Sequence, residues 1–580
     1  MRFKSRLAKP AAKVPERSRP RTGRMLLAAL LAVVAVVGAL ALSACGGSGG
    51  GNGDSTTTAS GDVPQGGVLR IGTQVLADTV NPFTAVNLGS WAIFTQIYPQ
   101  LVQYDKDANL VGDFAKSWEF SDRGRTLTFE TATNGKWSDG EPLTAEDAAW
   151  TINTIVKYQK GPAAGFAAGV KDIASASAPD AGTLVVTFKT PIATALSQLQ
   201  TLWILPQHVW ESKVGTKGKG LREFTNPAPV VSGGSFVMTK YQQDELAIFE
   251  RNPGYYGPKP NLDGFGLQIF SNPDAVLTAL QNDEVDIALG LEAVTAPTLE
   301  RNPKFKVLRG YNLVWTTFGF NSNEDKKEHP ELRDPQVRLA FAHAINVPEL
   351  IKVTRYGAAT PAATQVAAGP FRDESLEPPA YDPDEANRLL DELGYERGGD
   401  GIRTADGHPM SYELLVPEGV GAPERKAQMF AKYLKAVGIE LKPVVLDNAQ
   451  YFSTVTGPDW TYMHSDVFLD NWGNYPDPNF ALSLMTCEQR GSLSETGYCN
   501  PEYDALFAKQ GKELDESARR DIVFEMEKIL YEDHPYLPLY DEQDTDGWSK
   551  AWEGYEPRVG GLVTNLSKQP LEGVHRAAAG

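Results

Sequence analysis

An apolar run without a single charged residue, residues 25–44, stands near the start of the chain and ends at Cys45. Residues 1–24 before it contain nine Lys or Arg and one acid, Glu16. A basic start followed by an apolar core is typical of an export signal, which is removed and takes no part in the fold. The alternative is a transmembrane anchor, because about 20 apolar residues can span a bilayer.

Small residues close the run, since Leu42, Ser43 and Ala44 stand directly before Cys45. This pattern resembles the lipobox of bacterial lipoproteins, which implies cleavage before Cys45 and acylation of its thiol; a free structural cysteine is the alternative. Each buried methylene of an acyl chain contributes about 0.8 kcal/mol, so a diacylated cysteine holds a protein at a membrane without a spanning helix. The Gly, Ser and Thr that follow predict a flexible tether. We therefore assign residues 1–44 to a signal peptide and residues 45–65 to the tether.

The formal charge of the chain is −18. Removal of residues 1–44 leaves 46 basic and 72 acidic residues, a charge of −26. An acidic exported body argues against nucleic acid as a partner, and against a cationic patch that binds membranes. The remaining cysteines, Cys487 and Cys499, stand in a Gly- and Ser-rich segment, where we expect a local disulfide, with two buried thiols as the alternative. Roughly 515 residues follow the tether, too many for one core, so at least two domains are expected.

Strand and helix patterns alternate along the body. Residues 126–130 alternate in polarity as a strand does, and Thr144 with Asp147 predicts the capped start of a helix. Asp382 followed by Pro383 predicts another helix start, and Gly394 its end. Further helices are expected from Pro273, from Asp334 with Pro335, over residues 427–437 and over residues 522–529, with strands over residues 285–289 and 438–446. The pattern is that of an α/β protein with mixed sheets.

The chain shows little that would support catalysis. Its seven histidines are scattered without a metal-binding spacing, so no metal site is expected, and His343 is interpreted as a structural residue of its helix. There is no nucleophile elbow and no phosphate loop, since the glycines of residues 46–53 belong to the tether. Carboxylate pairs are common in an acidic chain and identify no glycosidase. We expect binding without turnover, with no catalytic residue and no cofactor.

Several segments occur in an order that resembles a known family. They include "DFAKSWEFSDRGRTLTFETATNGKWSDGEPLTAEDAAWTI", "RNPGYYGPKPNLDGF", "DPQVRLAFAHAINVPELI", "YDPDEANRLLDELGY" and "NWGNYPDP". Together they resemble the extracellular solute-binding proteins of family 5, which include oligopeptide-, dipeptide- and nickel-binding components of ABC importers. The resemblance covers residues 66–540.

The resemblance implies an α/β, two-lobed fold of the periplasmic-binding-protein type (class II, cluster C) with mixed sheets and a hinge. The larger lobe would hold residues 66–317 and 540–580, and the smaller lobe residues 318–539. The chain would cross between them at residues 316–323 and 536–543. The implied protein is a monomer held outside the cell membrane by its lipid anchor alone, which captures a peptide or similar polar solute and delivers it to permease subunits with cytoplasmic ATPases.

The loop over residues 470–478 carries the best candidate ligand contacts: Trp472, Gly473, Asn474 and Tyr475. Peptide-binding members of the resembled family have an aspartate before this tyrosine, which pairs with the amino terminus of the ligand. An amide cannot neutralise a buried ammonium, and an unpaired buried charge costs several kcal/mol. Ligands with free amino termini are therefore not assured, and Asp470 or Asp477 could substitute for the missing aspartate.

Five aromatic or polar residues are weaker candidates, each more commonly found in a core than at a ligand: Asn81, Trp91, Tyr98, Trp315 and Phe318. Three other functions stay open. A glycoside or another non-peptide ligand fits the same fold. A secreted hydrolase with two carboxylates is a different class, and so is an adhesin or a chemoreceptor partner, because fold alone does not settle function.

Overall fold

The computed structural model describes residues 63–578, apart from 76, 86, 164–165, 458–463 and 491–493. The predicted signal peptide, Cys45 and most of the tether lie outside the described residues. Residues 63–580 form one compact unit. Among the helices described, none has the length and apolar character needed to cross a membrane.

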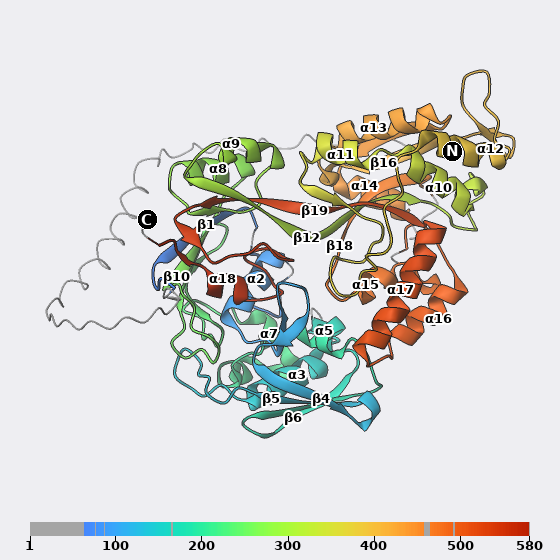
Figure 1. The fold of residues 1–580 in the computed structure, drawn as a ribbon. Helices are drawn as coiled ribbons and strands as arrows, with labels where there is room; N and C mark the ends of the chain where they lie inside the picture. The colour runs from blue at the N-terminus through green and yellow to red at the C-terminus, as the bar shows by residue number, and fades with distance from the viewer. Residues whose placement is uncertain are drawn as a thin grey trace, which may run out of the picture. The chain divides into compact units, whose positions relative to one another are not determined.

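A mixed sheet of eleven strands is the central element of this unit. Its two longest strands, β12 (Phe305–Phe320) and β19 (Tyr536–Ser549), are antiparallel neighbours that run across the middle of the fold in Figure 1. The strand order is β17-β16-β18-β12-β19-β11-β1-β10-β9-β8, with β13 also paired to β19. The other strands are β1 (Val68–Thr73), β8 (Phe236–Gln242), β9 (Leu246–Arg251), β10 (Gly264–Ile269), β11 (Ile287–Ala288), β13 (Ala359–Pro361), β16 (Ser411–Pro417), β17 (Glu440–Leu446) and β18 (Val467–Gly473).

Both kinds of strand pairing occur in this sheet, as the sequence predicts. β1 is parallel to β10 and β11, and β16 is parallel to β17 and β18, whereas β12 is antiparallel to β18 and β19. Parallel neighbours need crossover connections, and helices supply them. The α/β class with mixed sheets is therefore confirmed.

A second sheet, in the order β4-β5-β7-β6, lies at the bottom of Figure 1 together with α3. Thr144 caps α3 (Ala145–Tyr158) by the predicted capping box, since its side chain accepts an N–H while the Asp147 carboxylate accepts the N–H of Thr144. The strands are β4 (Ala115–Ser121), β5 (Thr126–Thr131), β6 (Ile173–Asp180) and β7 (Thr183–Phe188). Small sheets pair β2 (Val102–Tyr104) with β3 (Leu110–Gly112), β14 (Thr404–Ala405) with β15 (His408–Pro409), and β20 (Trp552–Glu553) with β21 (His575–Arg576).

The helix starts predicted from caps are confirmed. The side chains of Asn272, Asp334 and Asp382 accept N–H groups at the starts of α8 (Pro273–Gln281), α10 (Pro335–Ala344) and α12 (Pro383–Glu392). Each of these helices has a proline in its first turn. The proline lacks a backbone N–H, but the N–H groups of a first turn have no acceptor within the helix, so no hydrogen bond is lost. Other helices are α2 (Leu88–Ile97), α5 (Ala195–Gln200), α9 (Ala296–Glu300), α11 (Val347–Thr354), α13 (Pro423–Ala436), α14 (Asn448–Thr456), α15 (Asn479–Ser483), α16 (Pro501–Gln510), α17 (Glu516–Asp533) and α18 (Gln569–Gly573).

The strand expected over residues 285–289 is shorter than predicted, because only Ile287 and Ala288 form ladder pairs. The N–H groups of Glu284 and Val285 donate to the carbonyl of Ala279, at distances of 2.8 and 3.4 Å, and so close the end of α8. Those backbone groups are then not available to a strand.

Separate hydrophobic clusters fill the two halves of the unit. Phe305 and Phe318 both lie on β12, yet Phe305 packs with α8 and α9 whereas Phe318 packs with α10 and α13. On β19, Leu537 belongs to the second cluster and Trp548 to the core of the first half. Both long strands therefore pass from one core to the other, and the two-lobed fold is confirmed. The boundaries at residues 317/318 and 539/540 stay a prediction, and the packing places the change of core a few residues to one side of them, because Trp315 and Tyr540 already belong to clusters of the second half.

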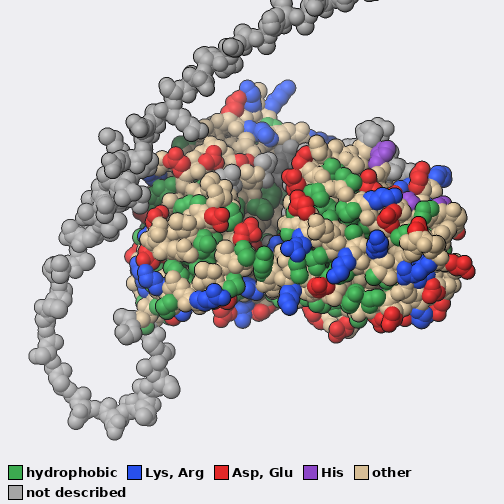
Figure 2. Space-filling model, turned by 90° about the horizontal axis from the view of Figure 1, so that it is seen from above, with side chains coloured by type: hydrophobic (Ala, Val, Ile, Leu, Met, Phe, Trp, Pro, Cys, Tyr) green, Lys and Arg blue, Asp and Glu red, His purple; other side chains and the backbone are tan. Residues whose placement is uncertain are grey.

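Charged side chains cover the described surface in a mixed arrangement. On the face shown in Figure 2, Lys and Arg are interspersed with Asp and Glu, and hydrophobic side chains stand between them.

Candidate functional site

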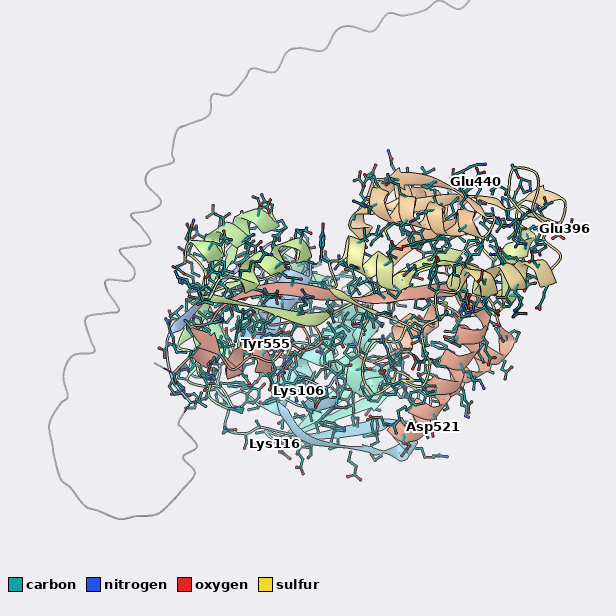
Figure 3. All side chains as sticks on the ribbon, turned by 45° about the horizontal axis from the view of Figure 1, so that its top comes forward. Lys106, Lys116, Glu396, Glu440, Asp521 and Tyr555 are labelled. Atoms are coloured by element: carbon teal, nitrogen blue, oxygen red, sulfur yellow. A yellow bond between two sulfur atoms is a disulfide. The ribbon has the colours of Figure 1, made fainter. Side chains whose placement is uncertain are left out.

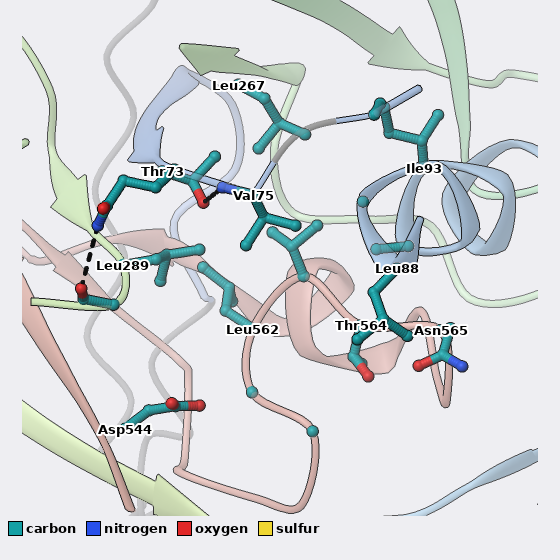
Figure 4. Close-up of a pocket in the computed structure, with 18 of the residues that line it drawn as sticks. Thr73, Val75, Leu88, Ile93, Leu267, Leu289, Asp544, Leu562, Thr564 and Asn565 are labelled. Carbon is teal, nitrogen blue, oxygen red and sulfur yellow. Dashed lines mark hydrogen bonds between the residues drawn. The ribbon is translucent and has the colours of Figure 1, made fainter. Parts of the chain in front are cut away.

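A cavity of about 710 Å³ lies between the two halves of the fold. In Figure 4, Val75, Leu88, Leu267 and Leu562 converge on this space from four separate segments. Leu313 and Val314 of β12 line it where this strand passes between the halves, and the second half contributes the loop over residues 472–475 and Phe480. A cavity of this size and largely apolar lining is typical of a site for a small organic ligand.

The loop singled out in the sequence lines this cavity with all four of its predicted residues. β18 ends at Gly473, and its pairing with β12 sets Trp472 opposite Trp315. The Trp472 indole donates to Glu495 Oε2 at 3.2 Å, which fixes the ring against the cavity wall. Tyr475 is 39% exposed and packs edge-on against Phe480. Their roles as ligand contacts stay a prediction that this placement supports.

Asn474 is held by the chain itself. Its amide Nδ2 donates to the carbonyl of Gln365 at 2.7 Å, and its Oδ1 accepts the N–H of Tyr475 at 2.9 Å. Its backbone N–H donates to the carbonyl of Leu313 at 2.6 Å. The Asn474 side chain is 6% exposed, so it shapes the loop and presents no negative charge to a ligand.

The two acids that could have replaced the missing aspartate are both engaged. Asp477 accepts two hydrogen bonds from Arg519, at 2.8 and 2.9 Å, and one from Ser197 at 3.1 Å. Burial raises the pKa of Asp477, but Arg519 outweighs it and leaves that pKa below its usual value. Asp470 lies beside Glu495, and burial raises the pKa of both carboxyls, so the pair keeps a proton more readily than isolated acids.

Acidic side chains at a different place face the cavity: Asp244, Asp544 and Asp546. Asp546 accepts the N–H of Gly290 at 3.0 Å, and burial together with the nearby charge of Asp544 raises its pKa. The lining residues that the structure describes include no Lys or Arg. Sequence reasoning missed Asp544 and Asp546, although acids two positions apart on a strand point to the same face.

The three weaker candidates of the opening segment do not line the cavity. Asn81 is 2% exposed. Its amide donates to the carbonyl of Leu221 in α7 (Gly220–Glu223) and to the carbonyl of Phe224, which directly follows that helix. Tyr98 is fully buried, and its hydroxyl accepts from Asn226 at 2.9 Å. Trp91 packs on Trp203 behind the face of α2 that lines the cavity.

The two candidates at the first crossing are buried in the second half. Trp315 is 1% exposed and meets Tyr536 edge-on at 5.8 Å, and Phe318 packs against Phe341 and Phe430. Neither lines the cavity. Their β-strand neighbours Leu313 and Val314 do, because a strand turns as it passes from one core to the other.

Cys487 and Cys499 are joined by a disulfide, as predicted. The bond ties η8 (Cys487–Gln489) to the residues directly before α16, whose N-cap is Asn500. It belongs to the second half, close in sequence to the loop that lines the cavity.

The fold and its cavity define a two-lobed solute-binding protein. Residues 109–492 match the family described as "Bacterial extracellular solute-binding proteins, family 5 Middle". The chain belongs to this family, whose members serve ABC transporters as binding proteins and not as enzymes. A Brucella ovis protein named as an ABC transporter peptide-binding protein is 31% identical over 69% of this chain and 72% of its own length.

Solved structures share the fold. An ABC transporter substrate-binding protein of Sinorhizobium meliloti is 24% identical, with a TM-score of 0.73, over 88% of this chain and 100% of the other. NikA of Brucella suis, in complex with Fe(III)-EDTA, is 23% identical, with a TM-score of 0.72 and the same coverage. These likenesses confirm the predicted two-lobed fold.

Proposed function

We propose that the chain is a lipid-anchored receptor that captures a peptide or similar polar organic solute in the interlobe cavity. It then delivers this solute to the permease of an ABC importer. The observation that carries the proposal is the cavity, which both halves line and which includes the predicted loop of Trp472 to Tyr475. The name of the Brucella relative favours a peptide, and a glycoside or another non-peptide solute is the alternative.

Closure of the two lobes would control access to the cavity. We place the hinge at residues 316–323 and 536–543, as the resemblance implies. This is close to where the strands pass from one half's cluster to the other, between Phe305 and Trp315 on β12 and between Tyr540 and Trp548 on β19. Hinges are short segments at which the backbone absorbs the change between open and closed forms. The hydroxyl of Ser197 on α5 reaches Asp477 beyond β18, so the lobes also meet beside the cavity.

The charge of the lining limits the ligand. Three aspartates face the cavity, and none of the lining residues described is basic. The raised pKa of Asp546 makes it keep its proton more readily than an isolated aspartate, so the negative charge comes mainly from Asp244 and Asp544. Like charges in a partly dry site repel, so an anionic solute is disfavoured against a neutral or cationic one of the same shape. The apolar walls favour a ligand with a substantial apolar part.

Gly473 offers a direct test of the site. An added Cβ at this position meets no heavy atom within 4 Å, so a larger side chain would project into open space that the cavity shares. The probes are three tripeptides that are identical except at one position, which is Gln, Lys or Glu. We expect Gly473→Phe to fold normally and to lose binding of these peptides. Isothermal titration calorimetry measures this loss, and the wild type is expected to bind the Glu peptide most weakly.

Gly399→Phe is the matched control, because Gly399 also has no neighbour within 4 Å of an added Cβ but does not line the cavity. It should bind as the wild type does. If Gly473→Phe retains wild-type affinity for a peptide that the wild type binds, the cavity is not the binding site.

The lipid anchor is tested separately through Cys45→Ala. Because the proposal needs acyl chains on Cys45 to hold the protein, the variant should leave the membrane fraction and lose the mass of those chains. Fractionation of host cells and intact-protein mass spectrometry measure both effects. An unchanged membrane fraction would contradict the anchor without touching the binding site.

A further inference from the structure

Three side chains that can bind metals come together in the second half: His329, Glu331 and His408. Each offers one ligand atom, and these atoms lie within 4.8 Å of one another. None of the three lines the interlobe cavity. In the chain, Thr404 and Met410 stand on either side of His408, and their backbones are hydrogen-bonded to those of Glu396 and Glu440. Figure 3 labels Glu396 and Glu440, which lie at the opposite side of the molecule from Tyr555.

Two local elements position these groups. Glu331 lies in the 3-10 turn η6 (Pro330–Arg333), and His329 precedes that turn with a left-handed backbone, φ 54°. His408 opens β15 in the short hairpin with β14. The two elements are remote in sequence, and the rings of His329 and His408 meet edge-on at 6.1 Å.

The polar atoms of the cluster are not all satisfied by the described chain. Glu331 is 3% exposed, and its Oε1 accepts the hydroxyl of Tyr412 at 2.8 Å and lies 3.2 Å from His329 Nδ1. Its Oε2 is buried without a hydrogen-bond partner among the described residues, and so is Nδ1 of His408. A buried carboxylate oxygen without a partner costs roughly 1–3 kcal/mol or more, so such atoms call for an explanation.

The cluster also carries the charge that a cation needs. Glu331 supplies one carboxyl group to the cluster, and a second acid, Asp466, stands behind His329. Nε2 of His329 lies 3.9 Å from Asp466 Oδ2, and Asp466 in turn pairs with Lys326 at 2.7 Å. A carboxylate behind an imidazole is the usual second partner of a metal-binding histidine.

We propose that His329, Glu331 and His408 bind a divalent transition-metal ion of the zinc type. Two imidazoles and one carboxylate suit Zn²⁺ and its neighbours, whereas Ca²⁺ and Mg²⁺ prefer oxygen ligands alone. The ion would give Glu331 Oε2 and His408 Nδ1 the partner they lack. It would also fasten η6 to the β14–β15 hairpin and leave one coordination position for water.

The sequence gives little sign of this site, because its members are brought together only by the fold. His329 and Glu331 are two positions apart, a spacing that fits no helical metal motif, and His408 stands on a distant hairpin. Because no metal-binding spacing is present, the sequence alone predicts no metal site.

The test uses the full chain, stripped of metal with a chelator and titrated with Zn²⁺ alone. We expect one Zn²⁺ per chain and a higher melting temperature, since a ligand that binds only the folded state stabilises it. Co²⁺ in place of Zn²⁺ should give the visible absorption of a site with nitrogen ligands. Glu331→Gln and His408→Asn should each lose more than about 100-fold in Zn²⁺ affinity, because outer-shell partners alone are worth roughly 10- to 100-fold.

His208→Asn is the control, because His208 also pairs with a carboxylate, Asp139, but in the other half. It should bind Zn²⁺ as the wild type does, and circular dichroism shows whether each variant is folded. The proposal is overturned if wild-type protein binds no stoichiometric Zn²⁺. It is also overturned if folded Glu331→Gln and His408→Asn bind as tightly as the wild type.

Discussion

Asn474 is a buried residue that links two segments in the wall of the interlobe cavity. Its amide joins the end of β18 to the carbonyl of Gln365, and its backbone N–H joins the same loop to Leu313. A carboxylate at this position could not donate to that carbonyl. The resemblance implies an aspartate at this position for a ligand's amino terminus, and Asn474 instead holds the loop in place.

This predicts an order of stability for two variants of Asn474. Asn474→Ala leaves the carbonyl of Gln365 without a donor and should cost about 1–3 kcal/mol in the free energy of unfolding. Asn474→Asp should cost more at pH 7, because a buried carboxylate then faces a carbonyl oxygen. As the pH falls, the new carboxyl is protonated and can donate. Because burial raises its pKa above the ordinary value of about 3.9, the gap between the variants should have narrowed by about pH 4. Urea unfolding at pH 7 and at about pH 4 measures the difference in free energy of unfolding between the two variants. Equal stabilities at pH 7 would contradict the role of Asn474 as a buried donor.

Glu527 is a second residue whose environment controls its charge. It is fully buried on α17, where its carboxyl accepts from Thr364 at 2.6 Å and from the N–H of Asp373 at 2.9 Å. Burial raises its pKa to about 7, against hydrogen bonds that lower it. The folded state therefore holds a proton that the unfolded chain has already released at pH 6.

A pH dependence of stability follows with a definite sign. A carboxyl with a raised pKa gives its full contribution below about pH 4.5 and loses it as the pH rises through about 7. Between these two pH values, the loss of the Glu527 proton should lower the free energy of unfolding of the wild type by up to about 3 kcal/mol, at roughly 1.4 kcal/mol per pH unit. Glu527→Gln should lack this decrease, as urea unfolding from pH 4.5 to 8 would show. Parallel curves for both proteins would refute the assignment.

At the scale of elements, helix starts are well predicted because their causes are local. Thr144, Asn272, Asp334 and Asp382 each cap a helix by accepting a nearby N–H, and the two partners stand only two or three positions apart in the sequence. The short strand before residue 289 shows the limit of such reasoning, because its length depends on how α8 ends. The order of strands in the sheet and the Asp477–Arg519 pair both depend on residues that are far apart in the sequence. No local sequence pattern could therefore predict them.

The link between Asp477 and α17 gives a prediction at this scale. Arg519 of α17 is 5% exposed and pairs with Asp477 through two hydrogen bonds. Asp477→Ala should cost about 3–5 kcal/mol, because it leaves a buried guanidinium unpaired.

The double variant Asp477→Ala with Arg519→Met removes that charge as well, so it should be more stable than Asp477→Ala alone. A double-mutant cycle in guanidinium chloride measures the coupling. Additive losses would mean that the two residues do not act as a pair.

At the scale of the whole molecule, the two lobes share one sheet and have separate cores. β12 and β19 carry residues of both cores, so movement of one lobe against the other must bend these two strands. The ordered motifs of the sequence were enough to predict this architecture and the loop at Trp472. They could not identify Asp546 or the His329 cluster, because those groups meet only after the chain has folded.

Closure should be visible in solution. If the lobes close on a solute about these strands, the radius of gyration should fall when a binding peptide is added to protein that has been unfolded and refolded to remove endogenous ligand. Small-angle X-ray scattering measures the change, and Gly473→Phe with the same peptide should show none. An identical radius with and without saturating ligand would contradict closure.

The central claim is that the interlobe cavity holds a solute without converting it. Native mass spectrometry of the protein purified from its own host tests this most directly. The account predicts one small molecule per chain in the wild type, unchanged in mass after long incubation, and its absence from Gly473→Phe. The same bound mass in both proteins, or conversion of the bound molecule into products of different mass, would contradict it.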